Sequence, residues 1–285
     1  MKIKAFAKVN LSLDVTGKRA DGYHTLSSVF QSVSLCDIVE IKKADRISVK
    51  CSDLSLNGED NLCNTAAVKF FEVAKIQGGA EIFIEKHIPL AAGLGGGSTD
   101  AGAVLKGLNE LYGKPLSEQK LLEIALSLGA DVPFCMVGGT KLCEGIGEIM
   151  TELPSLPECY IVIAKKGQKS STGDMYKALD SLTDRKKSDV EKIKSGLETG
   201  SLIEIFLGAY NCSELVCEQS ALKEARELAI SSNAVYCGLS GAGPSVIAVY
   251  ENPNKALNGL EIFKTQGFQS FLVEPTNVGC GKTEY

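Results

Sequence analysis

The feature that most constrains this chain is a glycine-rich segment at residues 89–100, which reads PLAAGLGGGSTD. Four glycines fall within five residues, at positions 93, 95, 96 and 97, and apolar residues then recur at helical spacing from Ala101 to Tyr112. This pattern predicts a flexible loop that leads into an amphipathic helix. Glycines let backbone N–H groups approach a ligand closely, and the first N–H groups of a helix carry partial positive charge. The segment therefore predicts an anion site, most often one for phosphate.

A simpler interpretation is that Ser98, Thr99 and Asp100 only cap a helix after a glycine-rich turn. Capping alone does not account for four glycines, because each costs roughly 0.5–1 kcal/mol of chain entropy at an ordinary position. We therefore favour a phosphate site.

The segment differs from the common phosphate loops. Gly281-Lys282-Thr283 resembles the end of a Walker A motif, but Thr276 stands where its first glycine should be, and we interpret it as a C-terminal tail. The pattern G-x-G-x-x-G occurs nowhere in the sequence. These absences argue against P-loop and Rossmann proteins. G-x-S-x-G and H-E-x-x-H are absent as well, which disfavours common hydrolases.

Length and composition indicate a soluble globular protein of one large or two medium domains, with 285 residues, 44% of them hydrophobic and 23% charged. A formal net charge of −5 argues against nucleic-acid partners, so local donors must hold any anionic ligand. No apolar run is long enough to cross a membrane and no signal peptide is visible, so we expect a cytoplasmic protein with no membrane partner. Nothing in the sequence indicates an oligomeric state.

The ten cysteines do not form a metal or redox motif. None are spaced C-x-x-C, and the chain has only two histidines, His24 and His87. These spacings therefore argue against a zinc site or a redox dithiol. Most cysteines lie among apolar residues, which is typical of reduced, buried side chains.

Residues 3–15 alternate strictly between apolar and polar positions and predict one strand, with Lys8 and Asn10 side by side on its polar face. Helical and strand patterns then follow in mixed order, including a charged stretch at 177–200 that we expect to be helical. Pro154 and Pro157 mark the expected domain boundary. The pattern predicts a mixed α+β protein with domains at 1–153 and 154–285.

Two further segments contain candidate functional residues. GADVPF at residues 129–134 places Asp131 in what we expect to be a short extended turn, because Pro133 disfavours helical backbone at Val132. A second glycine cluster, GLSGAGPS at 238–245, precedes a clean strand. By itself it is equally consistent with a plain turn and with a second loop of donors that faces a phosphate.

Taken together, these segments resemble the GHMP kinases. The residues concerned are AKVNL at 7–11, RADGYH at 19–24, GLGGGS at 93–98, GADVPF at 129–134 and SGAGPS at 240–245. Their combination is similar to one family within that group, the 4-diphosphocytidyl-2-C-methyl-D-erythritol kinases of the non-mevalonate isoprenoid pathway. The resemblance spans nearly the whole chain.

The resemblance implies a two-domain fold. We expect an N-terminal ATP-binding domain like domain 2 of ribosomal protein S5, a ferredoxin-like C-terminal domain, and an active site in the cleft between them. It also implies transfer of the γ-phosphoryl group of ATP to the 2-hydroxyl of a small alcohol that carries a cytidine diphosphate.

The resemblance also assigns residues to roles. Asp131 would be the base that takes the proton of the hydroxyl, and Lys8 would keep Asp131 ionised and stabilise the transferring phosphoryl group. Asn10 would position this pair or the substrate. Each has a simpler alternative: Asp131 could cap a turn, and Lys8 could be a solvated strand lysine like Lys4.

For the cytidine end, Tyr23 would stack on the cytosine ring and His24 would hydrogen-bond to its edge. Tyr176 would close the other face, and Thr172 would donate a hydrogen bond to the ligand. The alternatives are a structural turn histidine and a core aromatic side chain.

For ATP, the resemblance implies that the glycine loop wraps the phosphates and that Lys86 and Asn61 lie near the adenine and ribose. The loop residues are Pro89, Leu90, Ala91, Ala92, Gly93, Leu94, Gly95, Gly96, Gly97, Ser98 and Thr99. The second glycine loop contributes Ser240, Gly241 and Gly243. Mg²⁺ is expected as the partner of ATP, and the sequence does not indicate its ligands.

Two other functions stay open. One is a GHMP kinase that acts on another small alcohol, such as homoserine or mevalonate. The other is an ATP-binding regulator of the same fold without catalysis. The group Asp21-Gly22-Tyr23-His24 favours a substrate that carries a nucleobase.

Overall fold

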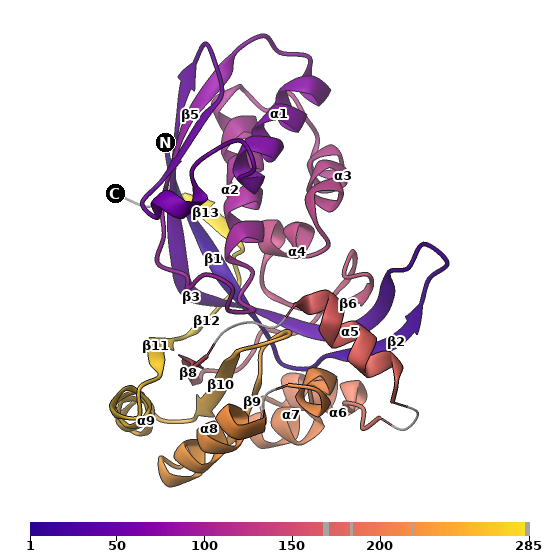
Figure 1. Ribbon diagram of the computed structural model, residues 1–285, viewed down its shortest axis with the longest axis vertical. Coiled ribbons are helices and arrows are strands. Elements are labelled where there is room, and N and C mark those ends of the chain that lie inside the picture. The colour runs from indigo at the N-terminus through magenta and orange to yellow at the C-terminus, as the bar shows by residue number, and fades with distance from the viewer. Residues whose placement is uncertain (168–170, 183–184, 218, 283–285) are drawn as a thin grey trace.

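The computed structural model describes residues 1–167, 171–182, 185–217 and 219–282. Within them the chain forms two sheets, each covered by helices (Figure 1). The strands of the first sheet are β1 (Lys2–Asn10), β2 (Asp14–Lys18), β3 (His24–Ala44), β4 (Ser48–Cys51), β5 (Gly79–Glu85), β6 (Thr140–Gly145), β7 (Ile149–Glu152), β12 (Pro275–Thr276) and β13 (Cys280–Lys282). Those of the second are β8 (Tyr160–Lys165), β9 (Tyr236–Leu239), β10 (Ser245–Tyr250) and β11 (Gln269–Val273).

The long strand β3 organises the first sheet. The start of β3 pairs with β2 and β6, its middle part from Phe30 to Glu40 pairs with β1, and its end pairs with β5. The continuous order is β13-β1-β3-β5-β4, in which only β4 and β5 are parallel to each other. Because β3 spans both halves, it fixes the position of β1 relative to the loops at the other end of the sheet.

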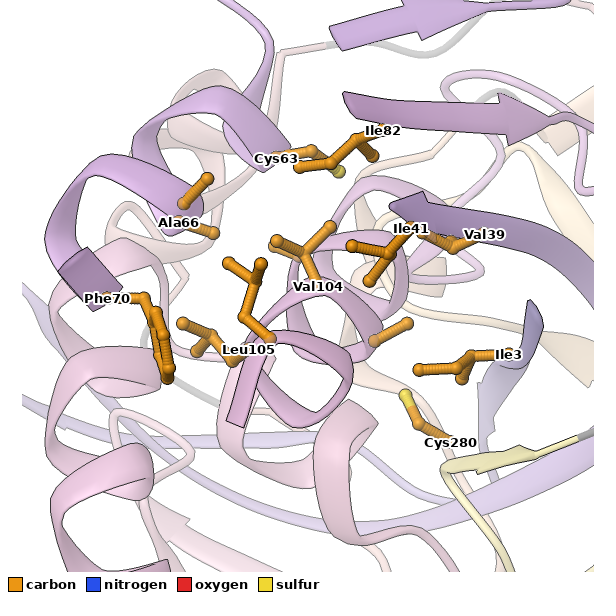
Figure 2. Packing of buried hydrophobic residues seen from close by; sticks show 14 of the residues in the cluster. Ile3, Val39, Ile41, Cys63, Ala66, Phe70, Ile82, Val104, Leu105 and Cys280 are labelled. Carbon is orange, nitrogen blue, oxygen red and sulfur yellow. The ribbon is translucent and has the colours of Figure 1, made fainter. Parts of the chain in front are cut away.

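Four helices cover one face of this sheet: α1 (Leu62–Ala74), α2 (Gly96–Leu111), α3 (Glu118–Leu128) and α4 (Val132–Val137). Their apolar residues pack against the alternating apolar residues of the strands, as expected for amphipathic elements. Figure 2 shows Val104 and Leu105 of α2 between Phe70 of α1 and Ile41 of β3. This core anchors α2, whose first turn follows the glycine loop.

The second sheet has the antiparallel order β11-β8-β10-β9, which together with its crossover helices is ferredoxin-like. Its helices are α5 (Thr172–Asp180), α6 (Val190–Thr199), α7 (Leu202–Gly208), α8 (Gln219–Ser231) and α9 (Pro253–Thr265). Helices α8 and α9 contribute buried residues to one core beside the sheet, including Leu222 and Phe263. On the other face, Ile161 and Ile247 join a core with Val9 of β1, so the two sheets share buried residues. The predicted α+β class is confirmed.

Several expected elements differ from the structure. The alternating segment 3–15 is not one strand, because β1 ends at Asn10 and β2 begins at Asp14. The charged stretch 177–200 contains the end of α5 and then α6, which begins after the Asp189 cap, and residues 183–184 lie outside the described residues. Alternation and charge do not reveal such breaks, since both continue across them.

The expected C-terminal tail is also wrong. Residues 280–282 form β13, which pairs with β1 from Ile3 to Ala5, and Thr283 lies outside the described residues. In Figure 1 the yellow β13 lies beside the indigo β1. A three-residue strand is too short to show a period, so only its partner identifies it. The proposed boundary between residues 153 and 154 stays a prediction, and β12 and β13 return to the first sheet after it.

None of the ten cysteines forms a disulfide, and seven of them are buried. None of the helices among the described residues is both long and apolar enough to span a bilayer.

Candidate active site

A cavity of about 910 Å³ lies where the glycine loop, β1, α4 and α5 meet. It is lined by many of the residues singled out from the sequence: Lys8, Asn10, Tyr23, His24, Lys86, every residue from Pro89 to Ser98, Asp131, Thr172, Tyr176 and Gly241. Its volume is large for a small-ligand site and has room for two ligands side by side.

The glycine loop connects β5 to α2 and is held against β1. The backbone N–H of Lys8 donates to the carbonyl oxygen of Leu94 at 3.0 Å. Gly95 is the N-cap residue of α2, with a φ of 73°, and a side chain there would come within 3.0 Å of the Lys8 side chain. No side chain caps this helix, so Ser98, Thr99 and Asp100 are not N-caps. The first N–H groups of a 16-residue helix therefore start at the cavity with no side-chain cap, which suits an anion.

Lys8 and Asn10 lie side by side on β1, as the alternation predicts. The Lys8 ammonium donates to Asn10 Oδ1 at 2.9 Å, and Asn10 Nδ2 donates to Ser28 Oγ at 2.9 Å. The Ser28 hydroxyl in turn donates to the carbonyl oxygen of Ser12. Each bond fixes the direction of the next, so the Asn10 amide can present only its oxygen to Lys8. This chain of bonds orients the ammonium.

Lys8 is nearly buried, with 4% of its surface exposed, and its ammonium lies 4.4 Å from the centre of the Phe30 ring. The alternative of a solvated strand lysine is therefore wrong. Such a cation needs compensating groups, and here they are Asn10, the face of Phe30 and the carboxylate of Asp131. Nothing in the sequence around Phe30 and Ser28 predicts that they contribute to the surroundings of Lys8.

The carboxylate of Asp131 lies 3.4 Å from the Lys8 ammonium, and 37% of its side chain is exposed. The expected extended turn is wrong, because α4 begins at Val132 directly after Asp131, which has helical backbone angles. Pro133 is tolerated there because the first turn of a helix does not need its N–H group. The Asp131 side chain makes no capping hydrogen bond, so the turn-cap alternative does not hold and its oxygens face the cavity freely.

Helix α4 reaches this position because it packs closely on α2. A side chain at Gly102 would come within 3.3 Å of the Met136 backbone. The glycine therefore permits an approach of the two helices that carries Asp131 toward Lys8.

The second glycine loop contacts the first one from the other sheet. The Ser240 hydroxyl accepts from the backbone N–H of Asn10 at 3.3 Å and donates to the carbonyl oxygen of Gly93 at 3.4 Å. Lys165, at the end of β8, donates to the carbonyl oxygen of Leu90 at 2.7 Å. Gly241 lines the cavity, whereas Ser240 and Gly243 support it from outside.

At the opposite end of the cavity, Tyr23 is 61% exposed and precedes His24, the first residue of β3. The His24 ring stacks on the Tyr176 ring of α5, with centroids 4.6 Å apart and planes 5° from parallel. Burial raises the pKa of Tyr176 to about 12, so its hydroxyl stays protonated. Thr172 lines the same end from the start of α5.

Lys86 lies behind the glycine loop in a buried cluster of charges. Its ammonium contacts Asp37 Oδ2 and lies 2.7 Å from Asp100 Oδ2. Burial acts to lower the pKa of Lys86, but the two carboxylates outweigh it and raise that pKa above its usual value. Burial and the charge of Asp37 raise the pKa of Asp100 to about 8, although Lys86 opposes them. Neither Asp37 nor this cluster was anticipated from the sequence.

Two predicted ATP-binding residues do not line the cavity. Asn61 caps α1, with its amide engaged by Cys63 and Leu56. Thr99 is fully buried, and its hydroxyl faces the Cys280 sulfur at 3.8 Å. Their proposed contacts with ATP stay predictions.

The residues described here contain no group of three or more histidine, cysteine or carboxylate side chains placed to hold a metal ion. Asp100 is buried and bonded to Lys86, so it is poorly placed as a ligand. Asp131 and Ser98 are among the oxygen-bearing side chains that line the cavity. This fits Mg²⁺ that enters with nucleotide phosphates, because that ion is commonly held by few protein ligands.

Comparison with known proteins identifies the family. The profile of the GHMP kinases N terminal domain matches residues 61–139, and that of the GHMP kinases C terminal matches residues 186–268. A 4-diphosphocytidyl-2-C-methyl-D-erythritol kinase from Caldicellulosiruptor bescii is 43% identical over 269 residues, which cover 93% of this chain and 94% of the relative. This chain belongs to that family of GHMP kinases. It is an enzyme, a small-molecule kinase.

Solved structures agree with this assignment. A crystal structure of a 4-(cytidine 5'-diphospho)-2C-methyl-D-erythritol kinase superimposes with a TM-score of 0.82 and 31% identity, covering 99% of this chain and 100% of the other. A homoserine kinase from Cytophaga hutchinsonii has a TM-score of 0.76 but 20% identity, covering 98% and 96%, so it shows the shared fold only. The expected two-domain GHMP kinase fold is confirmed.

Proposed function

We propose that this GHMP kinase transfers the γ-phosphoryl group of ATP to the 2-hydroxyl of 4-diphosphocytidyl-2-C-methyl-D-erythritol, in the non-mevalonate route to isoprenoid precursors. The observation that carries the proposal is the position of the Lys8–Asp131 pair. It lies in one cavity with a glycine loop suited to phosphate and with aromatic and imidazole groups suited to a nucleobase.

Asp131 acts as the base in this reaction. Its carboxylate takes the proton of the 2-hydroxyl as the hydroxyl oxygen bonds to the γ-phosphorus, while the bond from that phosphorus to the β-phosphate oxygen breaks and ADP leaves. A tertiary alcohol is a hindered nucleophile, so alignment contributes much of the rate. The open face of Asp131 and its contact with Lys8 suit this role.

Lys8 stabilises the charge that develops on the phosphoryl oxygens. Its ammonium is held in direction by Asn10 and cannot swing into solvent, because Phe30 and the loop enclose it. The backbone N–H groups of the glycine loop and of the first turn of α2 bind the ATP phosphates. Mg²⁺ would arrive with ATP, near Ser98 at the end of the glycine loop, and neutralise phosphate charge.

A coupled assay of ADP release with purified protein, ATP and Mg²⁺ tests the proposal. We expect turnover with the cytidyl substrate and none with homoserine or mevalonate. Turnover with another alcohol would retain the kinase and reject the substrate. ATP binding without any turnover would instead support the regulator hypothesis.

The Asp131→Asn variant tests the base. Removing a general base lowers rates by about 10²–10⁴-fold, so kcat should fall by that factor. The KM for ATP should change little, because the glycine loop is untouched. A kcat within threefold of the wild type would reject Asp131 as the base.

A further inference from the structure

The imidazole of His24 is held by a side chain that the function above does not use, the carboxylate of Asp180. His24 Nε2 and Asp180 Oδ1 lie 2.7 Å apart, and the Lys18 ammonium lies 2.7 Å from Asp180 Oδ2. Lys18 ends β2, His24 begins β3 and Asp180 ends α5, so three elements meet at this carboxylate. The His24 side chain is only 9% exposed.

The ion pair between Lys18 and Asp180 determines which partner donates in the hydrogen bond between His24 and Asp180. The hydrogen bond from Lys18, and to a smaller extent the one from His24, lowers the pKa of Asp180 below its usual value. An ionised carboxylate can only accept hydrogen bonds. His24 must therefore donate from Nε2, and in the neutral imidazole Nδ1 is then an acceptor.

The Tyr176 ring fixes the plane of this imidazole. The two rings are nearly parallel, and both line the cavity. Among the described residues, no group hydrogen-bonds to His24 Nδ1. A base that bonds edge-on to Nδ1 would lie in the plane of the imidazole, and therefore parallel to the Tyr176 ring, where the two can stack.

We propose that Asp180 is a positioning residue for base selectivity, which acts by fixing the tautomer of His24. This inference rests on the proposed function. The exocyclic amino group of cytosine is a donor and matches an acceptor at Nδ1. Uracil has a carbonyl oxygen at the same place, and two acceptors would then face each other without a proton. The carboxylate thus favours a cytidyl ligand over a uridyl one without touching it.

The Asp180→Asn variant reverses this arrangement. Lys18 needs an acceptor and takes the amide oxygen, so the amide nitrogen faces His24 Nε2 as a donor. Nε2 then accepts, and the proton moves to Nδ1. Asp174→Asn is the matched control, because Asp174 lies on the same helix and pairs with Lys177 instead of His24.

Nitrogen NMR of the histidine rings measures the tautomer directly. The chain contains only two histidines, and His87→Gln leaves His24 alone. We expect the Nε2–H tautomer in the His87→Gln protein and in its Asp174→Asn derivative, and the Nδ1–H tautomer after Asp180→Asn. An unchanged tautomer in the Asp180→Asn protein would overturn the inference.

Selectivity is measured as kcat/KM for the cytidyl substrate divided by that for its uridyl analogue. A mismatched buried hydrogen bond discriminates by at least about tenfold, so the ratio should fall by that factor in Asp180→Asn and stay constant in Asp174→Asn. Asp180→Ala, which leaves both tautomers open, should give an intermediate ratio. An unchanged ratio rejects the inference alone. Absence of turnover with either nucleotide substrate in the wild type rejects the proposed function as well, while the tautomer remains measurable.

Discussion

The ammonium of Lys8 shows how neighbouring side chains hold a single residue in one position. Asn10, Phe30 and Asp131 contact it from three sides, and each comes from a different part of the chain. The lysine is therefore held in one position before any ligand binds. Preorganised charge of this kind is more effective than charge that must reorient during the reaction.

Asp100 makes a pH-dependent contribution to stability. Its pKa in the folded protein is raised to about 8, chiefly by burial and then by Asp37. At pH values between the unfolded and the folded pKa, Asp100 holds a proton in the folded protein that the unfolded chain has released. The stabilisation that Asp100 provides is therefore greatest at low pH, falls as the pH rises, and is lost once the pH passes 8. From pH 7 to pH 9 the wild type should lose on the order of 1 kcal/mol that Asp100→Asn does not lose.

Urea denaturation of both proteins at the two pH values measures this difference. Cys51, Cys63, Cys135 and Cys280 also surround Asp100, and burial is the main cause of the raised pKa of each thiol. Because Asp100→Asn leaves their burial unchanged, their contribution to the loss of stability is nearly the same in both proteins. Parallel losses of stability in wild type and variant would contradict the prediction.

Residues close in sequence were the ones that could be predicted. Lys8 and Asn10 share a strand face, so their period alone placed them together. Asp37, Ser28 and Asp180 join the site through contacts between distant segments, and neither charge nor spacing distinguishes them from ordinary surface residues. The resemblance suggested the proposed role of Asp131 but did not predict the helical backbone angles of that residue.

Among the elements, the junction of the glycine loop and α2 depends on the backbone conformation of Gly95. Gly95 has a positive φ, and a Cβ added there would lie 3.0 Å from the Lys8 side chain and 3.2 Å from the Cys135 sulfur. Gly97 lies two residues later inside α2 and has no positive φ, and a Cβ added there would meet no atom within 4 Å outside its own helix. The two glycines offer a matched pair.

Gly95→Ala should lower the free energy of unfolding by about 1–3 kcal/mol, because it adds backbone strain and a clash. Gly97→Ala should leave it unchanged or raise it by up to about 1 kcal/mol, since alanine favours a helix. Chemical denaturation of both variants measures these values. Equal changes in the free energy of unfolding at the two positions would contradict a special role for the backbone conformation of Gly95.

At the scale of the whole molecule, both sheets hold the glycine loop. Lys165 and Ser240 bond to its carbonyl groups from the second sheet, while β1 bonds to it from the first. The first sheet in turn includes β13, which follows the second sheet in the chain. The two halves of the molecule are therefore interdependent.

A chain that ends at Val278 tests this dependence. It lacks β13, so Ile3 to Ala5 lose their pairing partner and the buried Cys280 leaves a gap beside α2. We expect a loss of roughly 3–5 kcal/mol or failure to fold. Lys282→Ala removes an ion pair between an exposed lysine and the partly exposed Glu110 and should change stability by less than about 0.5 kcal/mol. Cooperative unfolding of the shortened chain at wild-type stability would contradict the expectation.

The pairing of β13 with β1 also orders events during synthesis. The ribosome releases the strand that carries Lys8 first, and its outer neighbour follows only after the ferredoxin-like half has been made. Until then β1 is an open edge, and open edges invite association with other chains. An interrupted translation product should therefore be a target for chaperones and proteases instead of a folded but inactive kinase.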